Sequence, residues 1–268
     1  VVTNGTLLTE DKIIFCKEHK INIGLSVDGP RSITDMTRKA ENGMGAYPMI
    51  IHAMELLKKH DYIPSLSVTI SEDVLRNQAT VIDWLQEMHL SFGIKDISYN
   101  LLRFQDEGFD KKKYSIAASS FIIASYKQLG DIINDSRINR KILSLTRSTF
   151  FYGDCAAITG NQIVLKANGD IGLCQVFCQS DETTVGNVSA GSLSGIIENA
   201  VIPALGKYKH FLPVFRKSCQ KCEAIFTCGG GCYWESGECD KSCDIGYCQY
   251  SKILHAWMLG CLDKQATE

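Results

Sequence analysis

The stretch CQKCEAIFTCGGGC, residues 219–232, places four cysteines within fourteen positions. The two-residue spacer between Cys219 and Cys222 lets both sulfurs face one tetrahedral zinc ion. Four thiolates are equally the usual ligand set of an iron-sulfur cluster. Taken alone, the stretch leaves zinc, disulfides and an iron-sulfur cluster open.

The other cysteines extend this stretch into a longer pattern. The chain has 268 residues and twelve cysteines, eight of them from residue 219 onward. An ordered series begins at Cys155, passes through Gly169 and Cys174, and continues through the quoted stretch to Cys248. Clustered cysteines in a chain of this size without a visible secretory signal more often bind metal than form disulfides. Seven thiols in this order exceed any single metal site.

The cysteine order resembles the SPASM domain, the C-terminal extension of many radical SAM enzymes, and all seven motif cysteines and the glycine match. Upstream, the segments TNGTLLTED, NIGLSVDGP and DMTR resemble the second half of a radical SAM barrel. The resemblance covers nearly the whole chain. It identifies a radical SAM/SPASM peptide maturase, with the anaerobic sulfatase-maturating enzymes as relatives.

The resemblance implies two auxiliary four-iron four-sulfur clusters, whose ligands cross over in sequence. The second cluster would use Cys219, Cys222, Cys228 and Cys248, and the first would use Cys155, Cys174 and Cys232. The residues 229–231, all glycine, either form a tight turn or let the backbone approach the sulfides. Cys248 resembles the family's closing cysteine before a helix.

Of the five cysteines outside this motif, three have alternative roles. The first auxiliary cluster either takes Cys178 as its fourth ligand or keeps one iron open for a substrate group, and we favour the open iron. Cys239 and Cys243 could replace Cys248, form a disulfide or bind nothing.

The resemblance also implies a site for S-adenosylmethionine. Ser26 and Arg38 match positions that contact its ribose and carboxylate sides, and Asn4 and Asp28 lie in the flanking loop motifs. Asn-Gly and Asp-Gly-Pro are also ordinary turn sequences, so a purely structural role fits these loops too. The resemblance leaves the catalytic residue unknown.

The CxxxCxxC loop that binds the catalytic cluster is absent from the sequence, and so is the GGEP-like segment of the relatives. Both belong upstream of TNG. We therefore expect the chain to be a fragment, natural or artificial, and we expect a third four-iron four-sulfur cluster only in the missing N-terminal part.

Apolar runs and helical patterns alternate up to residue 105. Helices are expected at 9–20, 45–60 and 73–89, and buried strands at 21–27, 63–70 and 94–102. This order predicts a parallel α/β sheet with ligand loops after its strands. The resemblance makes it the second half of a partial (β/α)6 barrel.

The rest of the chain is expected to form two further parts. Residues 106–150 form a helical bridge, with helices near 114–130 and 138–148. Residues 151–268 form a small Cys-rich α+β SPASM domain, with a hairpin around Asn168 and Gly169 and a short helix near 192–207.

Charge and hydropathy exclude two classes of partner. The net charge of −2 and the pI near 6.3 give no support for nucleic acid or an anionic membrane. No apolar run approaches the length of a transmembrane helix, and the first residues lack the apolar core of a signal peptide. We expect a cytoplasmic protein.

The relatives act largely on peptides and proteins, and the resemblance implies an electron donor such as flavodoxin or ferredoxin. Sulfatase-maturating relatives carry an aspartate base directly after the cysteine that matches Cys174, whereas this chain has Gln175. This difference favours a maturase that forms thioether or carbon-carbon cross-links in a ribosomally made precursor peptide. The alternatives are formylglycine formation in a sulfatase and a non-catalytic cluster- or zinc-binding module that binds peptides.

Overall fold

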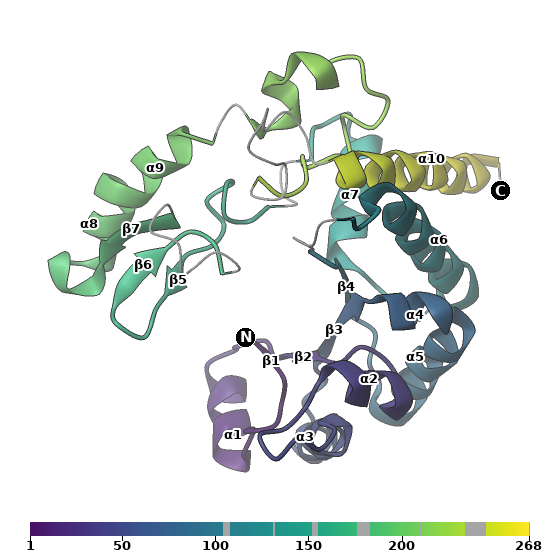
Figure 1. Cartoon of the computed structure of the whole chain (residues 1–268), viewed down its shortest axis with the longest axis vertical. Coiled ribbons are helices and arrows are strands. Elements are labelled where there is room, and N and C mark those ends of the chain that lie inside the picture. Colours follow the sequence, from purple (N-terminus) through teal and green to yellow (C-terminus); the bar gives the residue numbers. More distant parts are fainter. Residues whose placement is uncertain are drawn as a thin grey trace. The chain divides into compact units, whose positions relative to one another are not determined.

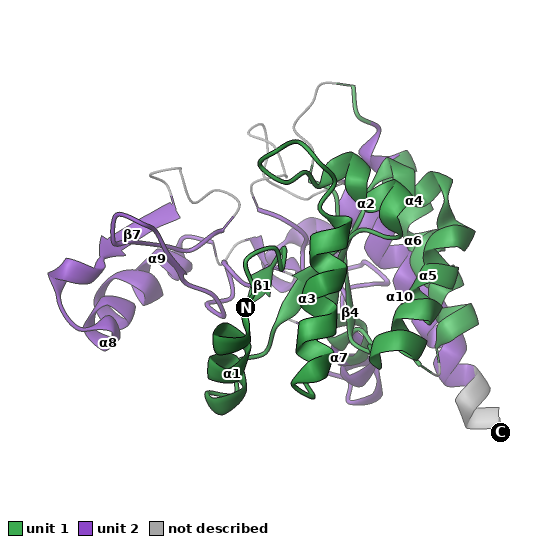
Figure 2. Cartoon of the chain, turned by 90° about the horizontal axis from the view of Figure 1, so that it is seen from below, with its two compact units in different colours: residues 1–109, 113–139 green, residues 110–112, 140–268 purple. Residues whose placement is uncertain are grey.

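The computed structural model describes residues 1–103, 108–130, 132–151, 155–175, 183–208, 211–233 and 245–267 (Figure 1). Its contacts divide the chain into two compact units (Figure 2). The first unit contains residues 1–109 and 113–139, and the second contains residues 110–112 and 140–268. The division into barrel half, bridge and SPASM domain remains a prediction.

The first unit is built on a parallel sheet whose spatial order follows the sequence. Its strands are β1 (Val2–Thr3), β2 (Gly24–Ser26), β3 (Ser65–Ile70) and β4 (Ile97–Leu101). The connecting helices are α1 (Glu10–Glu18), α2 (Arg31–Thr37), α3 (Tyr47–Lys59), α4 (Glu72–Arg76) and α5 (Gln78–Phe92). Parallel neighbours require such crossover helices. The predicted α/β class is confirmed.

The two faces of this sheet differ in polarity. The side chains of Leu25, Leu66 and Val68 are fully buried, as are those of Leu57 in α3 and Leu85 in α5. The alternate strand positions carry small polar side chains that are half-buried. The strands were predicted as buried, but they are apolar on one face of the sheet only, and the other face is polar. A parallel sheet covered on both faces would instead have continuous apolar strands.

The helix predicted at 73–89 is wrong as a single element, because it breaks at Asn77. There the backbone leaves the helical region (φ −121°, ψ 37°), and the side-chain amide donates to the Asp73 carbonyl at 2.8 Å. Ser71 caps α4, since its hydroxyl accepts from the Val74 amide at 3.2 Å. Helix α2 was missed because seven residues are too few to show helical periodicity.

Two longer helices follow the sheet, as predicted. They are α6 (Lys111–Leu129) and α7 (Ser136–Thr146). Asp135 caps α7, because its carboxylate accepts from the backbone amides of Arg137 at 2.8 Å and Ile138 at 3.3 Å. The Tyr114 hydroxyl of α6 donates to the Ile70 carbonyl at 2.7 Å, and this helix is thereby fixed to the end of β3.

The second unit contains the predicted hairpin. Its strands are β5 (Val164–Leu165) and β6 (Asp170–Gly172), and β6 pairs on its other side with β7 (Thr184–Asn187), which was not predicted. The hairpin turns at Gly169, whose φ of +85° suits glycine.

Helical segments follow the hairpin over the predicted range. They are η2 (Val188–Ala190), α8 (Leu193–Ile196), η3 (Ile197–Val201), which is a π turn, and α9 (Ile202–Gly206). Two short 3-10 turns lie further on, η5 (Pro213–Phe215) and η6 (Lys217–Cys219).

The chain ends in a long helix, α10 (Ile245–Thr267). The sequence predicts a helix after Cys248, but the helix begins earlier, so Cys248 lies in its first turn. Tyr250, Leu254 and Met258 are buried at four-residue spacing, and this spacing sets the packed face of α10. Among the described helices, none is long and apolar enough to cross a membrane.

Candidate cofactor and metal sites

A buried ion pair lies directly after strand β2. The Asp28 carboxylate accepts from Nε and from Nη2 of Arg38, each at 2.9 Å. It also accepts from the Thr37 hydroxyl at 3.0 Å and from the Thr69 amide at 3.1 Å. Asp28 is 3% exposed, whereas the Arg38 side chain keeps 24% of its surface exposed.

This geometry gives different roles to Asp28 and Arg38, which were both predicted as cofactor residues. Asp28 uses both carboxylate oxygens within the protein, so it orients Arg38. The remaining nitrogen of Arg38, Nη1, donates no hydrogen bond to another residue in the described part of the chain. A two-point ion pair fixes the plane of a guanidinium, which leaves Nη1 in a defined direction for a ligand carboxylate.

The other two predicted cofactor residues lie at the same edge of the sheet. Ser26 ends β2 and is half-buried, and its hydroxyl bonds to no other described side chain or backbone group. Asn4 follows β1, and its side-chain oxygen accepts from the Thr6 amide at 3.1 Å and from the Thr6 hydroxyl at 2.9 Å. Asn4 thus closes its own turn, while Ser26 retains its hydrogen-bonding capacity.

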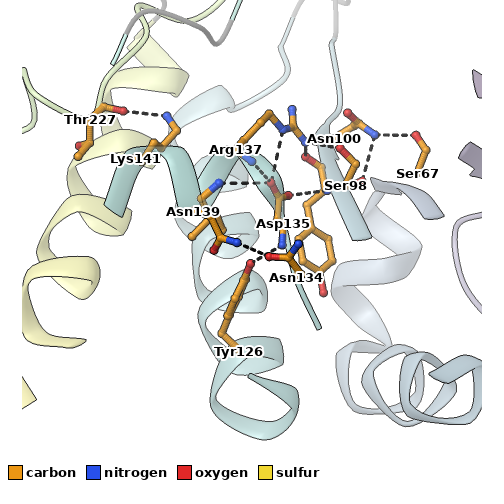
Figure 3. Close-up of polar contacts among 12 residues, drawn as sticks. Ser67, Ser98, Asn100, Tyr126, Asn134, Asp135, Arg137, Asn139, Lys141 and Thr227 are labelled. Carbon is orange, nitrogen blue, oxygen red and sulfur yellow. Dashed lines mark hydrogen bonds and ion pairs between the residues drawn. The ribbon is translucent and has the colours of Figure 1, made fainter. Parts of the chain in front are cut away.

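The polar face of the sheet continues beyond these residues (Figure 3). Strand register aligns Ser26 with Ser67 and Ser67 with Ser98. The Asn100 side-chain amide donates to the Ser67 hydroxyl at 2.9 Å, and Nη2 of Arg137 donates to the Ser98 hydroxyl at 3.2 Å. The sequence analysis did not predict this row of polar side chains. The sequence does contain a pattern that could have revealed it, because polar residues occupy every second position of these strands.

The predicted ligands of the first auxiliary cluster, or their neighbours in sequence, pack in or against one hydrophobic core. Cys174 is buried in it and Cys155 packs against it. Tyr233, the residue after Cys232, packs against the same core, and its ring centroid lies 5.3 Å from that of Phe211. Cys155, Cys174 and the residue after Cys232 therefore share one core of the second unit.

The predicted ligands of the second cluster lie on successive turns and at the start of α10. The Cys222 amide donates to the Cys219 carbonyl at 2.9 Å, and the Cys228 amide donates to the Ala224 carbonyl at 2.8 Å. Among the described residues, no three Cys, His, Asp or Glu side chains are gathered as a metal site. The division of the thiols between two clusters remains a prediction.

The chemistry of the donor set fits iron-sulfur clusters. All seven motif positions are cysteine, and sulfur-only ligand sets suit iron-sulfur clusters or zinc. Three further cysteines of open role, Cys178, Cys239 and Cys243, lie outside the described residues.

Comparison with known proteins places this fold. No protein-family model matches the chain. The chain is 25% identical over 243 residues to a cysteine-type anaerobic sulfatase-maturating enzyme of Clostridium perfringens, covering 86% of this chain and 63% of the relative. It is 22% identical over 262 residues to the serine-type enzyme of Klebsiella aerogenes, covering 94% and 62%. The chain thus spans less than two thirds of these relatives.

Solved structures agree with the sequence relatives. The structure of "Native anSMEcpe with bound AdoMet", where AdoMet is S-adenosylmethionine, matches with a TM-score of 0.77 and 21% identity, over 100% of this chain and 74% of that one. Streptococcus suis SuiB bound to S-adenosylmethionine matches with a TM-score of 0.60 and 15% identity, over 92% and 59%. The chain therefore has the radical SAM/SPASM type of fold, and the predicted resemblance to sulfatase-maturating enzymes is confirmed.

Proposed function

We propose that this chain is part of a radical SAM/SPASM maturase that oxidises a residue in a peptide or protein substrate. The observation that carries the proposal is the SPASM order of seven cysteines on a chain whose fold matches such an enzyme over 100% of its length.

The chain's own residues supply two parts of a cofactor site. Asp28 holds Arg38 so that Nη1 can donate to the carboxylate of S-adenosylmethionine, and Ser26 offers its hydroxyl to the ribose. When bound, S-adenosylmethionine and its cluster supply one-electron chemistry that removes a hydrogen atom from carbon. Cys219, Cys222, Cys228 and Cys248 would hold one auxiliary cluster, and Cys155, Cys174 and Cys232 the other.

A peptide substrate fits the polar face of the sheet. Ser67, Ser98 and Asn100 offer hydroxyl and amide groups to a peptide backbone, and Arg137 adds a positive charge at the same face. Support comes from the structure of "Native anSMEcpe with bound AdoMet and Cp18Cys peptide", which matches this chain with a TM-score of 0.75 and 20% identity over 99% of its length. Flavodoxin or ferredoxin is the proposed electron donor, and the cytoplasm is the proposed location.

The first candidate reaction is cross-link formation, as thioether or carbon-carbon bonds, in a ribosomally made precursor peptide. It is favoured by Gln175, which occupies the place of the aspartate base in the sulfatase-maturating relatives. The side chain is exposed. An amide does not accept a proton at neutral pH, so the formylglycine reaction would need another base.

The second candidate is formylglycine formation in a sulfatase. It is favoured by the relatives themselves, because the cysteine-type and serine-type enzymes that match this chain are both sulfatase-maturating. A zinc-binding or cluster-binding module without catalysis is the alternative of another class, and metal content separates the zinc-binding form from a redox protein.

The experiment uses the protein encoded with its upstream sequence, purified without oxygen and reduced in the presence of S-adenosylmethionine. It is offered a sulfatase-derived peptide and, separately, the Cys-rich peptides encoded nearby, and the products are analysed by mass spectrometry. A cross-linked product that lacks an aldehyde supports the first candidate, and an aldehyde product supports the second. Failure to cleave S-adenosylmethionine would contradict both.

A further inference from the structure

Two buried cations donate hydrogen bonds to the backbone on either side of Cys228. Nζ of Lys141 donates to the Thr227 carbonyl at 2.8 Å (Figure 3), and Nη2 of Arg216 donates to the Gly230 carbonyl at 3.2 Å. Lys141 is 4% exposed and Arg216 is 7% exposed. Removing a cation from water costs several kcal/mol, so two buried cations beside one short segment call for an explanation.

Lys141 contacts the neighbours of two predicted ligands of the same cluster. Thr227 precedes Cys228, and Tyr247, whose hydroxyl lies 3.4 Å from Nζ, precedes Cys248. The ammonium also lies 5.7 Å from the centroid of the Tyr247 ring and 4.6 Å from that of Phe151. Aromatic faces attract cations, so both rings stabilise the position of the Lys141 side chain.

Arg216 links a third ligand to the glycine turn. Its carbonyl accepts from the Cys219 amide at 3.0 Å, and its Nε donates to the Phe211 carbonyl. Gly230 has a φ of +93°, and a Cβ atom there would lie 2.9 Å from Nη2 of Arg216 and 3.1 Å from Cδ of Pro213. Glycine is therefore needed for the close approach of the guanidinium to this turn.

These contacts converge on one ligand set. Lys141 bonds to the residues that precede Cys228 and Cys248. The Arg216 carbonyl accepts from the Cys219 amide, and its side chain donates to the carbonyl of Gly230, two residues after Cys228. Positive charge near a cluster favours uptake of an electron. From this arrangement we propose that Lys141 and Arg216 are positioning residues of the second auxiliary cluster, which fix its ligand segment and raise its reduction potential. The inference rests on the proposed function, because it requires that cluster.

The test measures a potential in addition to iron content. In the whole chain, Cys155→Ala with Cys174→Ala removes the first cluster, so the signal of the second stands alone. Lys141→Met and Arg216→Met remove charge in this background, while Lys141→Arg and Arg216→Lys retain it. Each protein is reconstituted without oxygen using iron and sulfide, its iron is counted, and its potential is measured by EPR-monitored titration.

We expect each methionine variant to have a lower potential by about 59 mV or more, a tenfold change in the one-electron equilibrium. The charge-retaining variants should stay near the unaltered potential. If a methionine variant does not fold by circular dichroism, the glutamine variant takes its place. Unchanged potentials after loss of charge, or equal shifts in the charge-retaining variants, would overturn the inference. A parent protein that binds no iron would instead overturn the proposed function.

Discussion

Arg38 and Asp28 form a two-point ion pair, with both nitrogen-oxygen distances at 2.9 Å. The pair connects the end of helix α2 to the loop after β2, and the Thr69 amide ties the same carboxylate to β3. Because the carboxylate is buried and the guanidinium is partly exposed, the pair has an inner side that serves the fold and an outer side that can meet a ligand.

Asp28→Asn should therefore affect both stability and ligand binding. Removing one partner of a buried pair leaves the other uncompensated, and we expect the free energy of unfolding to fall by about 3 kcal/mol. Urea unfolding measures this change. Glu72→Gln is the matched control, since it breaks the exposed pair with Arg76 (2.9 Å), and it should cost less than about 1 kcal/mol. An equal loss of unfolding free energy in the two variants would show that burial of the Asp28 ion pair does not contribute to stability.

Ser26→Ala should weaken S-adenosylmethionine binding without changing stability. The hydroxyl bonds to no group in the described part of the protein, so its loss breaks no internal hydrogen bond there. One lost hydrogen bond to the ligand corresponds to about 1 kcal/mol, or roughly fivefold in affinity. Calorimetric titration of the protein with its upstream sequence measures this. Ser120→Ala on α6, which removes only a bond to the Ile116 carbonyl, should leave affinity unchanged.

Several elements could be predicted from the sequence because they depend on residues that are close together in the chain. The strands β2, β3 and β4 follow from their apolar runs, and the hairpin of β5 and β6 follows from the Asn-Gly turn. The break at Asn77 could not be predicted, because the apolar spacing of 73–89 continues through it, whereas the backbone of Asn77 leaves the helical region there. The cysteine order was assigned through its resemblance to the SPASM domain, because spacing alone left zinc, disulfides and a cluster open.

The polar contacts of the sites could not be predicted, because they join residues far apart in the chain. Lys141 and Thr227 are 86 positions apart, and Arg137 and Ser98 are 39 apart. No periodicity connects such pairs, because they depend on the tertiary packing within each unit.

Gly230→Ala should destabilise the second unit. The residue requires a positive φ, and its added methyl group would collide with Arg216 and Pro213. A loss of about 1–3 kcal/mol in the free energy of unfolding is expected from the strained backbone. Gly206→Ala is the control, because this glycine ends α9 and a Cβ atom added there would have no neighbouring atom within 4 Å. Equal stability of the two variants would contradict the assigned close approach.

Stability should fall at acidic pH partly through His255. Burial lowers the pKa of this side chain, and Nδ1 lies 3.0 Å from the Thr227 hydroxyl. The unfolded chain takes up a proton near pH 6.5, whereas the folded chain resists it, so this contribution is complete above about pH 6.5 and declines below it. Urea midpoints from about pH 7.5 to 5.5 should show a shallower slope in His255→Gln. His52→Gln, at an exposed position, should keep the parent slope.

The metal content of the chain tests the central claim most directly. Purified and reconstituted without oxygen, the chain should bind about eight irons with equal sulfide, as two four-iron clusters require. Cys232→Ala should lose the iron of the cluster that also uses Cys155 and keep most of the rest. Stoichiometric zinc in place of iron, or equal loss of both clusters in Cys232→Ala, would contradict the account.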